Sequence, residues 1–178
     1  FGPLLLLESL LPMSFVRLAL AVVLFSVGLA AVAEEPTGRG AIFFHPDGAS
    51  VAHWDAARML YVGPDGRLNW DRYPEVAPYR GHLSDQLAST SNGGAVSHAT
   101  GTRAHARSFG LDPEGREMVS ADGTTRTIVE AAIEAGIPTA LIQSGSLIEP
   151  GTAAFVAEAE QRGHYESIAR QVAESGVD

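Results

Sequence analysis

Apolar and polar residues alternate along most of the chain in blocks that predict strands and helices in turn. The wholly apolar run at 41–44 is typical of a strand that is buried on both faces of a parallel sheet. The next block, 51–61, carries apolar residues at helical spacing, and a Gly-Pro-Asp-Gly turn at 63–66 follows it. A strand, a turn and a helix in this order predict the start of an α/β unit.

The same alternation continues along the rest of the chain. It predicts further helices at 90–106, 125–135, 152–161 and 164–175. It predicts extended segments at 76–83 and 138–143. Together these elements predict an α/β fold with a mainly parallel sheet. Residues 175–178 combine a helix stop with the start of another strand, so we expect the domain to be incomplete in this chain.

The first forty residues follow a different pattern. Basic Arg17 precedes an apolar run, and Ala31 to Ala33 are small, which is the arrangement of a secretory signal peptide over 13–33. We expect cleavage after Ala33. The alternative is a membrane anchor, but the uncharged stretch 18–33 has about 16 residues, fewer than the roughly 20 that a spanning helix needs.

The domain organisation follows from these patterns. Residues 1–12 precede Met13 and resemble upstream sequence translated from an over-long gene prediction. Residues 34–40 contain proline and glycine and are expected to form a linker. Residues 41–178 form the folded domain.

Composition limits the chemistry that the chain can perform. It contains no cysteine, so disulfides and thiolate catalysis are excluded, and metal ligands must be oxygen or imidazole. Export without disulfides favours a periplasmic or secreted bacterial protein. The formal net charge of -9 argues against nucleic-acid binding, which needs a basic surface. It still admits a small phosphorylated substrate, because a bound metal can reverse the local charge.

Two segments carry candidate chemistry. Asp47 follows the first predicted strand, at the sheet edge where ligands bind in α/β proteins, and a carboxylate there suits zinc or magnesium. Its alternative role is a turn and cap residue. Residues 89–101 bring hydroxyls and small residues to a helix start, where the backbone N–H groups favour an anion. The alternative there is a tightly packed helix, and spacing alone does not separate the two.

From about Gly40 to the end, these segments resemble the alkaline phosphatase family. Residues 41–48 resemble its first strand and metal-binding aspartate, and Ala56-Ala57-Arg58 follows at the family's distance. The register of 99–101 places Ser91 where the family has its phosphorylated serine. The resemblance implies a three-layer α/β/α fold, of which 41–178 would be the amino-terminal part of the catalytic domain.

The resemblance also implies hydrolysis of phosphate monoesters through a phosphoserine at a two-zinc site, with magnesium left open as a third metal. Asp47 would bind the zinc that activates Ser91. The register of 152–155 places Glu149 at a metal-site position and Arg162 at that of the phosphate-binding arginine, whose planar fork suits two phosphate oxygens. The remaining metal ligands would lie beyond residue 178, so we expect this chain alone to be inactive. A homodimer is left open.

Several positions depart from the family pattern. Thr90 stands where the family has an aspartate, and it is an alternative nucleophile to Ser91. Gly151 replaces a hydroxyl residue that helps to hold magnesium, and Glu158 occupies a position that is often histidine. The third metal site is therefore either altered, with Glu149 as its remaining ligand here, or absent.

The histidines show no zinc-type spacing. His45 could approach the same ion as Asp47, but the corresponding family position is apolar, so we expect it to support the site or the fold. None of the others is expected to bind metal: His53, His82, His98, His105 and His164.

Two other functions stay open. One is a phosphodiesterase or sulfatase of the same superfamily, which shares the first-strand aspartate and the nucleophile at a helix start. The other is a non-catalytic phosphate-binding envelope protein, in which the helix start at Ser91 simply holds an anion.

Overall fold

The computed structural model describes residues 40–178, so the predicted signal peptide, the residues before it and most of the linker lie outside the described residues. The chain divides into two units, 1–43 and 44–178. In the first unit, the described residues 40–43 are exposed and belong to no helix or strand. Within the described part of the chain, we find no helix with the length and apolar character needed to cross a membrane.

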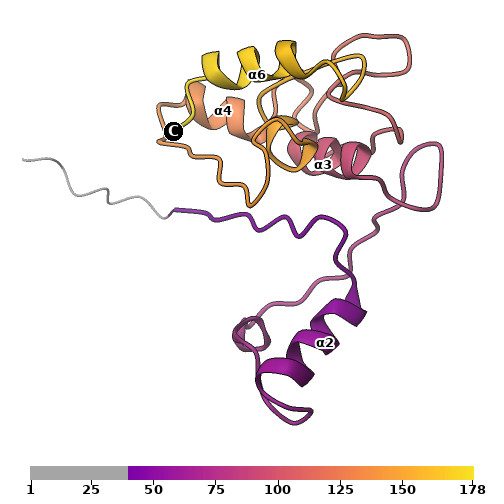
Figure 1. Cartoon of the computed structure of the whole chain (residues 1–178). Coiled ribbons are helices and arrows are strands. Elements are labelled where there is room, and N and C mark those ends of the chain that lie inside the picture. The colour runs from indigo at the N-terminus through magenta and orange to yellow at the C-terminus, as the bar shows by residue number, and fades with distance from the viewer. Residues whose placement is uncertain (1–39) are drawn as a thin grey trace, which may run out of the picture. The chain divides into compact units, whose positions relative to one another are not determined.

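The second unit consists of short helices joined by longer loops (Figure 1). Its elements in chain order are α2 (Val51–Tyr61), the 3-10 helix η1 (Asn69–Arg72), α3 (Ser91–Thr100), α4 (Ile128–Glu134), α5 (Pro150–Ala153) and α6 (Tyr165–Glu174).

Most of the predicted helices are present, and glycines decide where some of them end. The helix α2 has the predicted bounds, and α4 and α6 lie inside theirs. The predicted helix 90–106 ends earlier, at Thr100, because Gly101 adopts a left-handed conformation with φ 71° and its N–H bonds to the Ser97 carbonyl. Gly136 lies just after α4, has φ 70°, and its N–H donates to the Ile133 carbonyl.

The helix predicted over 152–161 is wrong in most of its length, because α5 ends at Ala153. Beyond it, the chain turns away to meet other segments. The Ala159 N–H donates to the Phe109 carbonyl at 2.8 Å in an antiparallel bridge. The backbone of Glu158 exchanges two hydrogen bonds with the Gln171 side chain of α6, at 3.0 and 2.8 Å. These contacts replace the helical hydrogen bonds that the sequence pattern suggests.

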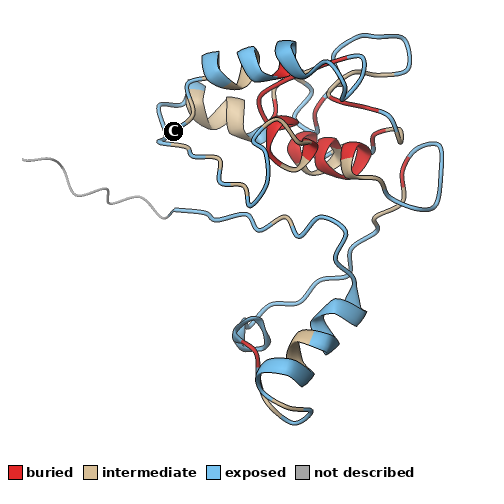
Figure 2. Ribbon diagram, viewed as in Figure 1, coloured by how far each residue is buried: buried red, intermediate tan, exposed pale blue. Residues whose placement is uncertain are grey.

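The core of the second unit lies around α3, which packs against α5 and α4. Figure 2 shows α3 largely buried, whereas much of α6 faces solvent. Small side chains on α3 and after α5 allow the close approach, and Phe109 and Ile168 fill the space with no exposed surface. The main buried cluster comprises Ala95, Val96, Ala104, Phe109, Ala153, Ala154, Ala157, Ala159 and Ile168.

The predicted parallel sheet is not confirmed, since no strand is assigned within residues 40–178. Residues 41–44 were expected to be buried, but Ile42 is 82% and Phe44 is 77% exposed. The extended segment predicted at 76–83 also forms no strand. A parallel strand needs neighbouring strands at its edges and helices on its faces. An apolar run in the sequence fits such a buried position, but it forms a strand only where those neighbouring strands and helices are present.

One pair of backbone bonds does follow the parallel pattern. The Leu141 N–H donates to the Asp178 carbonyl at 3.1 Å, and the Asp178 N–H donates to the Thr139 carbonyl at 3.0 Å. Two residues on one strand that flank a single residue on the other give the slanted hydrogen bonds of a parallel ladder. These two bonds have the parallel pattern, but no strand is assigned to either segment, so the predicted sheet stays a prediction.

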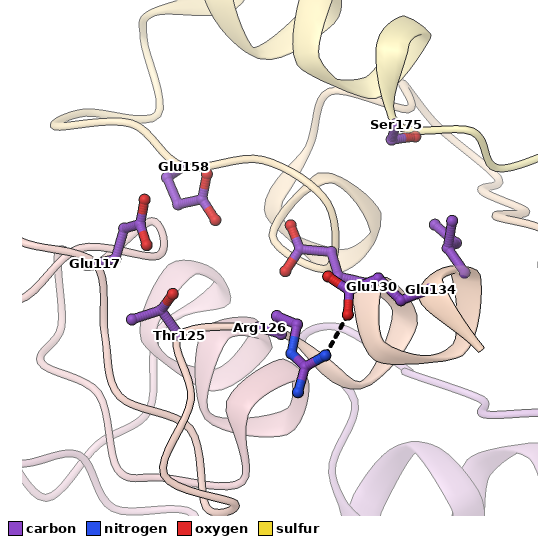
Figure 3. Close-up of a pocket in the computed structure, with 8 residues that line it drawn as sticks. Glu117, Thr125, Arg126, Glu130, Glu134, Glu158 and Ser175 are labelled. Carbon is purple, nitrogen blue, oxygen red and sulfur yellow. Dashed lines mark hydrogen bonds and ion pairs between the residues drawn. The ribbon is translucent and has the colours of Figure 1, made fainter.

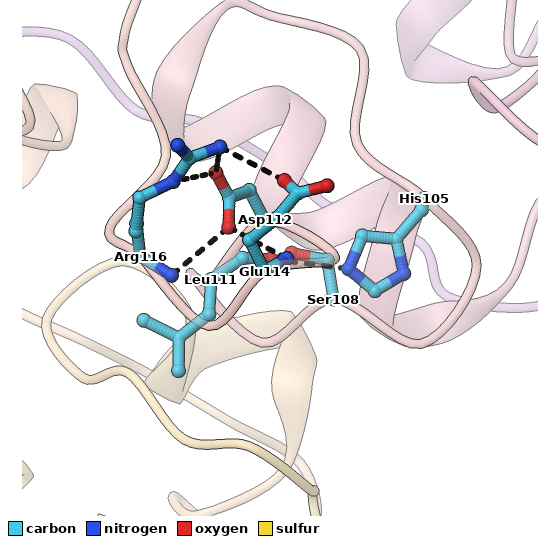
Figure 4. Close-up of polar contacts among 6 residues, drawn as sticks. All are labelled: His105, Ser108, Leu111, Asp112, Glu114 and Arg116. Carbon is cyan, nitrogen blue, oxygen red and sulfur yellow. Dashed lines mark hydrogen bonds and ion pairs between the residues drawn. The ribbon is translucent and has the colours of Figure 1, made fainter.

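A tight hairpin follows Phe109, with an antiparallel bridge between Leu111 and Glu117. Figure 4 shows the polar contacts around it. The Asp112 carboxylate accepts hydrogen bonds from the backbone N–H groups of Glu114 and Arg116, both at 2.9 Å. These backbone bonds, with the Arg116 side chain, hold the pKa of Asp112 below its usual value. The Leu111 carbonyl accepts from Ser108 Oγ at 2.6 Å and lies 3.2 Å from His105 Nε2, which gives that histidine a structural contact.

Candidate active site

Asp47 lies in a tight turn between the first apolar run and α2. Its N–H donates to the His45 carbonyl at 3.0 Å, and the Ala49 N–H donates to the Pro46 carbonyl at 3.2 Å. Gly48 completes the turn with φ 71°, a conformation that glycine adopts without steric cost. The turn leaves the Asp47 side chain exposed to solvent.

Ser91 is the first residue of α3, and its hydroxyl meets this aspartate. Ser91 Oγ donates a hydrogen bond to Asp47 Oδ1 at 3.0 Å, although the two residues are 44 positions apart. The structure therefore brings together the predicted metal-binding carboxylate and the predicted nucleophile. Both stand at the amino-terminal end of a ten-residue helix, where the helix dipole favours negative charge.

Thr90, the alternative nucleophile, uses its hydroxyl to cap the same helix. Thr90 Oγ1 accepts a hydrogen bond from the Gly93 N–H at 3.1 Å and donates to the Ala106 carbonyl at 2.7 Å. This is the usual role of a threonine at an N-cap. Its hydrogen is thus directed to a backbone carbonyl, whereas that of Ser91 is directed to a carboxylate.

The glycines after Ser91 let α3 pack closely beneath the site. A Cβ atom at Gly93 would lie 2.7 Å from the His105 carbonyl oxygen and 2.8 Å from the Leu83 side chain. A Cβ at Gly94 would lie 2.9 Å from Ser89 Oγ. Larger residues at these positions would push the helix away from its neighbours. The small-residue pattern therefore serves packing as well as placement of Ser91.

Glu149 and Arg162, the other two predicted site residues, contact each other. Arg162 Nη2 forms an ion pair with Glu149 Oε2, and the side chains of Arg162 and Glu149 are 47% and 44% exposed. Glu149 immediately precedes α5, which packs on α3. The predicted magnesium ligand and the predicted phosphate-binding group thus neutralise each other in this structure.

A contact between two histidines was not expected from the sequence. The Nδ1 atoms of His45 and His98 lie 2.9 Å apart, and the rings meet edge to face with centroids 4.9 Å apart. The Tyr79 ring lies 5.1 Å from the His98 ring. Burial lowers the pKa of His98 below its usual value, and the neighbouring His45 lowers it further. The available signal was that His98 follows Ser91 by seven residues and so shares its helix face.

The position of Gly151 connects these features. A Cβ atom there would lie 3.5 Å from His45 Cδ2 and 3.5 Å from Gln143 Nε2. The ring of His45 therefore lies beside the position where the family has a hydroxyl residue. No group of three or more histidine, aspartate or glutamate side chains suited to a metal ion occurs among residues 40–178.

The structure also has an acidic pocket of about 350 Å³, and none of the site residues described above lines it (Figure 3). Its wall includes three carboxylates, Glu117, Glu130 and Glu158, together with an ion pair between Arg126 and Glu134. Burial raises the pKa of Glu158 to about 7, and the nearby Glu130 and Glu117 contribute in the same direction. Glu158, which stands where the family often has histidine, therefore belongs to this pocket.

The sequence profile named alkaline phosphatase matches residues 39–178, which is most of the chain. The chain belongs to the alkaline phosphatase family. We find no match to it among curated proteins.

Solved alkaline phosphatases share the fold. The enzyme from the Antarctic bacterium TAB5 is 23% identical, with a TM-score of 0.63 over 74% of this chain and 36% of its own. A cold-active alkaline phosphatase from a psychrophilic Shewanella species is 24% identical, with a TM-score of 0.64 over 74% of this chain and 33% of its own. A TAB5 mutant with histidine replaced by glutamate, with magnesium bound in its M3 site, matches equally well, with a TM-score of 0.63. The chain spans about a third of the length of these structures.

Proposed function

We propose that the protein to which this chain belongs hydrolyses phosphate monoesters through a phosphoserine formed at Ser91. The observation that carries the proposal is the 3.0 Å hydrogen bond from Ser91 Oγ to Asp47 Oδ1 at the start of α3, in a member of the alkaline phosphatase family. A hydroxyl that donates to a carboxylate is already oriented for loss of its proton, which is what a serine nucleophile requires.

The proposed reaction has two steps. In the first, Ser91 Oγ forms a bond to phosphorus while the bond to the leaving alcohol breaks, and the alcohol departs with a proton. In the second, water attacks the phosphoserine, and Ser91 is regenerated with release of inorganic phosphate. Throughout both steps, the amino-terminal end of α3 faces the transferring group, and its dipole stabilises the negative charge.

Metal binding forms part of the proposal. Asp47 offers a hard, exposed carboxylate in contact with the nucleophile, and its oxygen ligands suit zinc or magnesium. Two zinc ions bound there would lower the proton affinity of the attacking and leaving oxygens. Residues 40–178 hold no group of three side chains that could complete the coordination of a metal ion at Asp47, so the remaining ligands would come from other parts of the protein.

Glu149 is the proposed ligand of a third, magnesium, site. The TAB5 mutant with glutamate in place of a histidine has magnesium bound in its M3 site, so such a glutamate is compatible with magnesium binding in a similar protein. Arg162 is the proposed phosphate-binding residue, because its guanidinium can donate to two phosphate oxygens. Its ion pair with Glu149 would have to open for Arg162 to reach a substrate.

Location and assembly are also proposals. Residues 13–33 would direct export to the periplasm or the exterior of a bacterium, which suits a metal-dependent hydrolase without cysteine. The substrate would be a small phosphorylated molecule. A homodimer stays open as the assembly.

The test compares this chain with a version extended to the native stop codon. We expect the extended protein to bind zinc and to hydrolyse phosphate monoesters faster than diesters or sulfate esters, while this chain alone shows little activity. Faster turnover of diesters or sulfate esters would instead support a phosphodiesterase or sulfatase. An extended protein that binds phosphate without hydrolysing any ester would overturn the proposal in favour of a binding protein.

A further inference from the structure

Two contacts attach the segment that carries Asp47 to the same face of α3. At the start of the helix, Asp47 Oδ1 accepts from Ser91 Oγ at 3.0 Å. Two turns further on, the Nδ1 atoms of His45 and His98 are 2.9 Å apart, which is a hydrogen-bond distance with one ring as donor and the other as acceptor. The segment therefore runs antiparallel to the helix, with its earlier residue against the later helical one.

We infer that the pair of His45 and His98 positions Asp47 against Ser91. A single hydrogen bond between exposed groups leaves the Asp47 turn free to rotate about it. A second contact, two residues away in the turn and seven residues away in the helix, fixes both the distance and the direction of the segment. His45 and His98 are positioning residues in this inference, and neither touches the reacting atoms.

The surroundings of the two rings support this role. His98 belongs to the largely buried helix α3, and the Tyr79 ring lies beside its ring with centroids 5.1 Å apart, so one member of the pair is fixed in the fold. The His45 ring lies beside the backbone of Gly151, which offers it room without a side chain. The turn itself is exposed at Asp47, whereas both histidines are partly buried. The buried contact can therefore hold the exposed one in place.

The inference deepens the proposed function, but its first test needs no catalysis. The chain contains no cysteine, so a double variant with Asp47→Cys and Ser91→Cys carries one specific pair of thiols. Its rate of disulfide formation in a fixed glutathione buffer reports how often the two positions meet. We expect His98→Phe, which keeps an aromatic ring but loses the nitrogen, to slow closure about fivefold, the factor expected for one hydrogen bond.

A conservative variant and a matched control make this result specific. His98→Asn retains a polar side-chain atom near the position of Nδ1, and we expect it to restore most of the closure rate. His164→Phe makes the same exchange just before α6 and should leave the rate unchanged. If His98→Phe unfolds by circular dichroism, His45→Phe, which likewise keeps a ring but loses the nitrogen, provides the test from the turn side. Closure at the parental rate in a folded variant without the pair overturns the inference.

Kinetics of the extended protein separate positioning from general stability. We expect His98→Phe to lower kcat about fivefold with KM unchanged, and His98→Asn to recover kcat. A rise in KM with unaltered kcat would contradict positioning of the nucleophile. If the wild-type extended protein hydrolyses no monoester, the proposed function fails, and the disulfide rates alone still decide whether the histidines position Asp47.

Discussion

Ser91 Oγ and Asp47 Oδ1 meet at 3.0 Å, although one begins α3 and the other lies in the turn before α2. Beside this pair, the hydroxyl of Thr90 bonds only to backbone groups, accepting from Gly93 and donating to Ala106. Two adjacent hydroxyls at one helix start thus have different partners. The difference gives each a distinct predicted consequence when it is removed.

Removal of the Ser91 hydroxyl should affect chemistry and leave stability nearly unchanged. In the extended protein, we expect Ser91→Ala to lose phosphoserine labelling and monoester hydrolysis, with little change in Tm because its hydroxyl contact is exposed. Thr90→Ala should keep labelling at Ser91 but lower the free energy of unfolding by about 1 kcal/mol through loss of the N-cap. Mass spectrometry after brief exposure to substrate locates the phosphate. A label on Thr90 in the Ser91→Ala protein would contradict this assignment.

The two tryptophans give a local probe of the α2 region. Trp54 and Trp70 are the only tryptophans in the sequence, and their ring centroids are 5.8 Å apart. Nearby, Arg58 donates two hydrogen bonds to Asp71, at 2.5 and 2.9 Å. The side-chain hydrogen bond from Arg58 lowers the pKa of Asp71 to about 2, helped by the Leu68 N–H.

This ion pair predicts how fluorescence depends on pH. The pKa of Asp71 is lowered in the folded chain. Its contribution to the stability of the folded state is therefore complete above the usual pKa of 3.8 and is lost as the pH falls through about 2. We expect tryptophan fluorescence to change in that range and Arg58→Ala to move the midpoint upward toward 3.8. Arg107→Ala, which lies outside this region, is the control. An unchanged midpoint in Arg58→Ala would show that the ion pair does not hold the region together.

The sequence predicts those elements whose signals are local. The bounds of α2 follow from the spacing of its apolar residues and from the turn after it. The helix α4 ends before Gly136, whose left-handed conformation closes the last turn of the helix. The predicted helix over 152–161 fails for the opposite reason. Its second half instead forms hydrogen bonds with Phe109 and Gln171. These partners lie outside the segment, so the spacing of apolar residues within it does not indicate them.

The candidate site divides in the same way. Asp47 and Ser91 were predicted from family register, and they do contact each other. The pair of His45 and His98 was not predicted, because it depends on the antiparallel course of the Asp47 segment along α3. The ion pair of Glu149 with Arg162 was not predicted either, since register alone placed both residues and their separation depends on the loop after α5.

The acidic pocket predicts that stability falls as pH rises. The pKa of Glu158 is raised from 4.5 to about 7 in the folded chain, so the folded state binds this proton more tightly than the unfolded state. The contribution of Glu158 to the stability of the folded state is complete below pH 4.5 and is lost as the pH rises through about 7. Since one pKa unit corresponds to about 1.4 kcal/mol and solvent screens a partly exposed carboxyl, we expect a loss of about 1 to 2 kcal/mol.

Urea unfolding of this chain at pH 5 and at pH 8 measures the effect. Glu158→Gln keeps the shape of the side chain and cannot ionise, so most of the difference between the two pH values should vanish. Glu160→Gln, an exposed change two residues away, is the matched control and should retain it. Equal pH dependence in the two variants would assign the effect to other groups.

The ion pair between Glu149 and Arg162 predicts competition between metal and phosphate. Glu149 can neutralise Arg162, as it does here, or bind magnesium and release the guanidinium toward phosphate. Glu149→Gln removes both options at once. In the extended protein without magnesium, we expect the variant to bind inorganic phosphate up to about fivefold more tightly, because a surface ion pair contributes at most about 1 kcal/mol. Stimulation by magnesium should disappear together with the ligand.

Phosphate inhibition constants, measured with and without magnesium, test both effects, with Glu160→Gln as the charge-matched control. Retained magnesium stimulation in Glu149→Gln would remove Glu149 from the metal site, whereas unchanged phosphate affinity would show that Arg162 was never restrained by it.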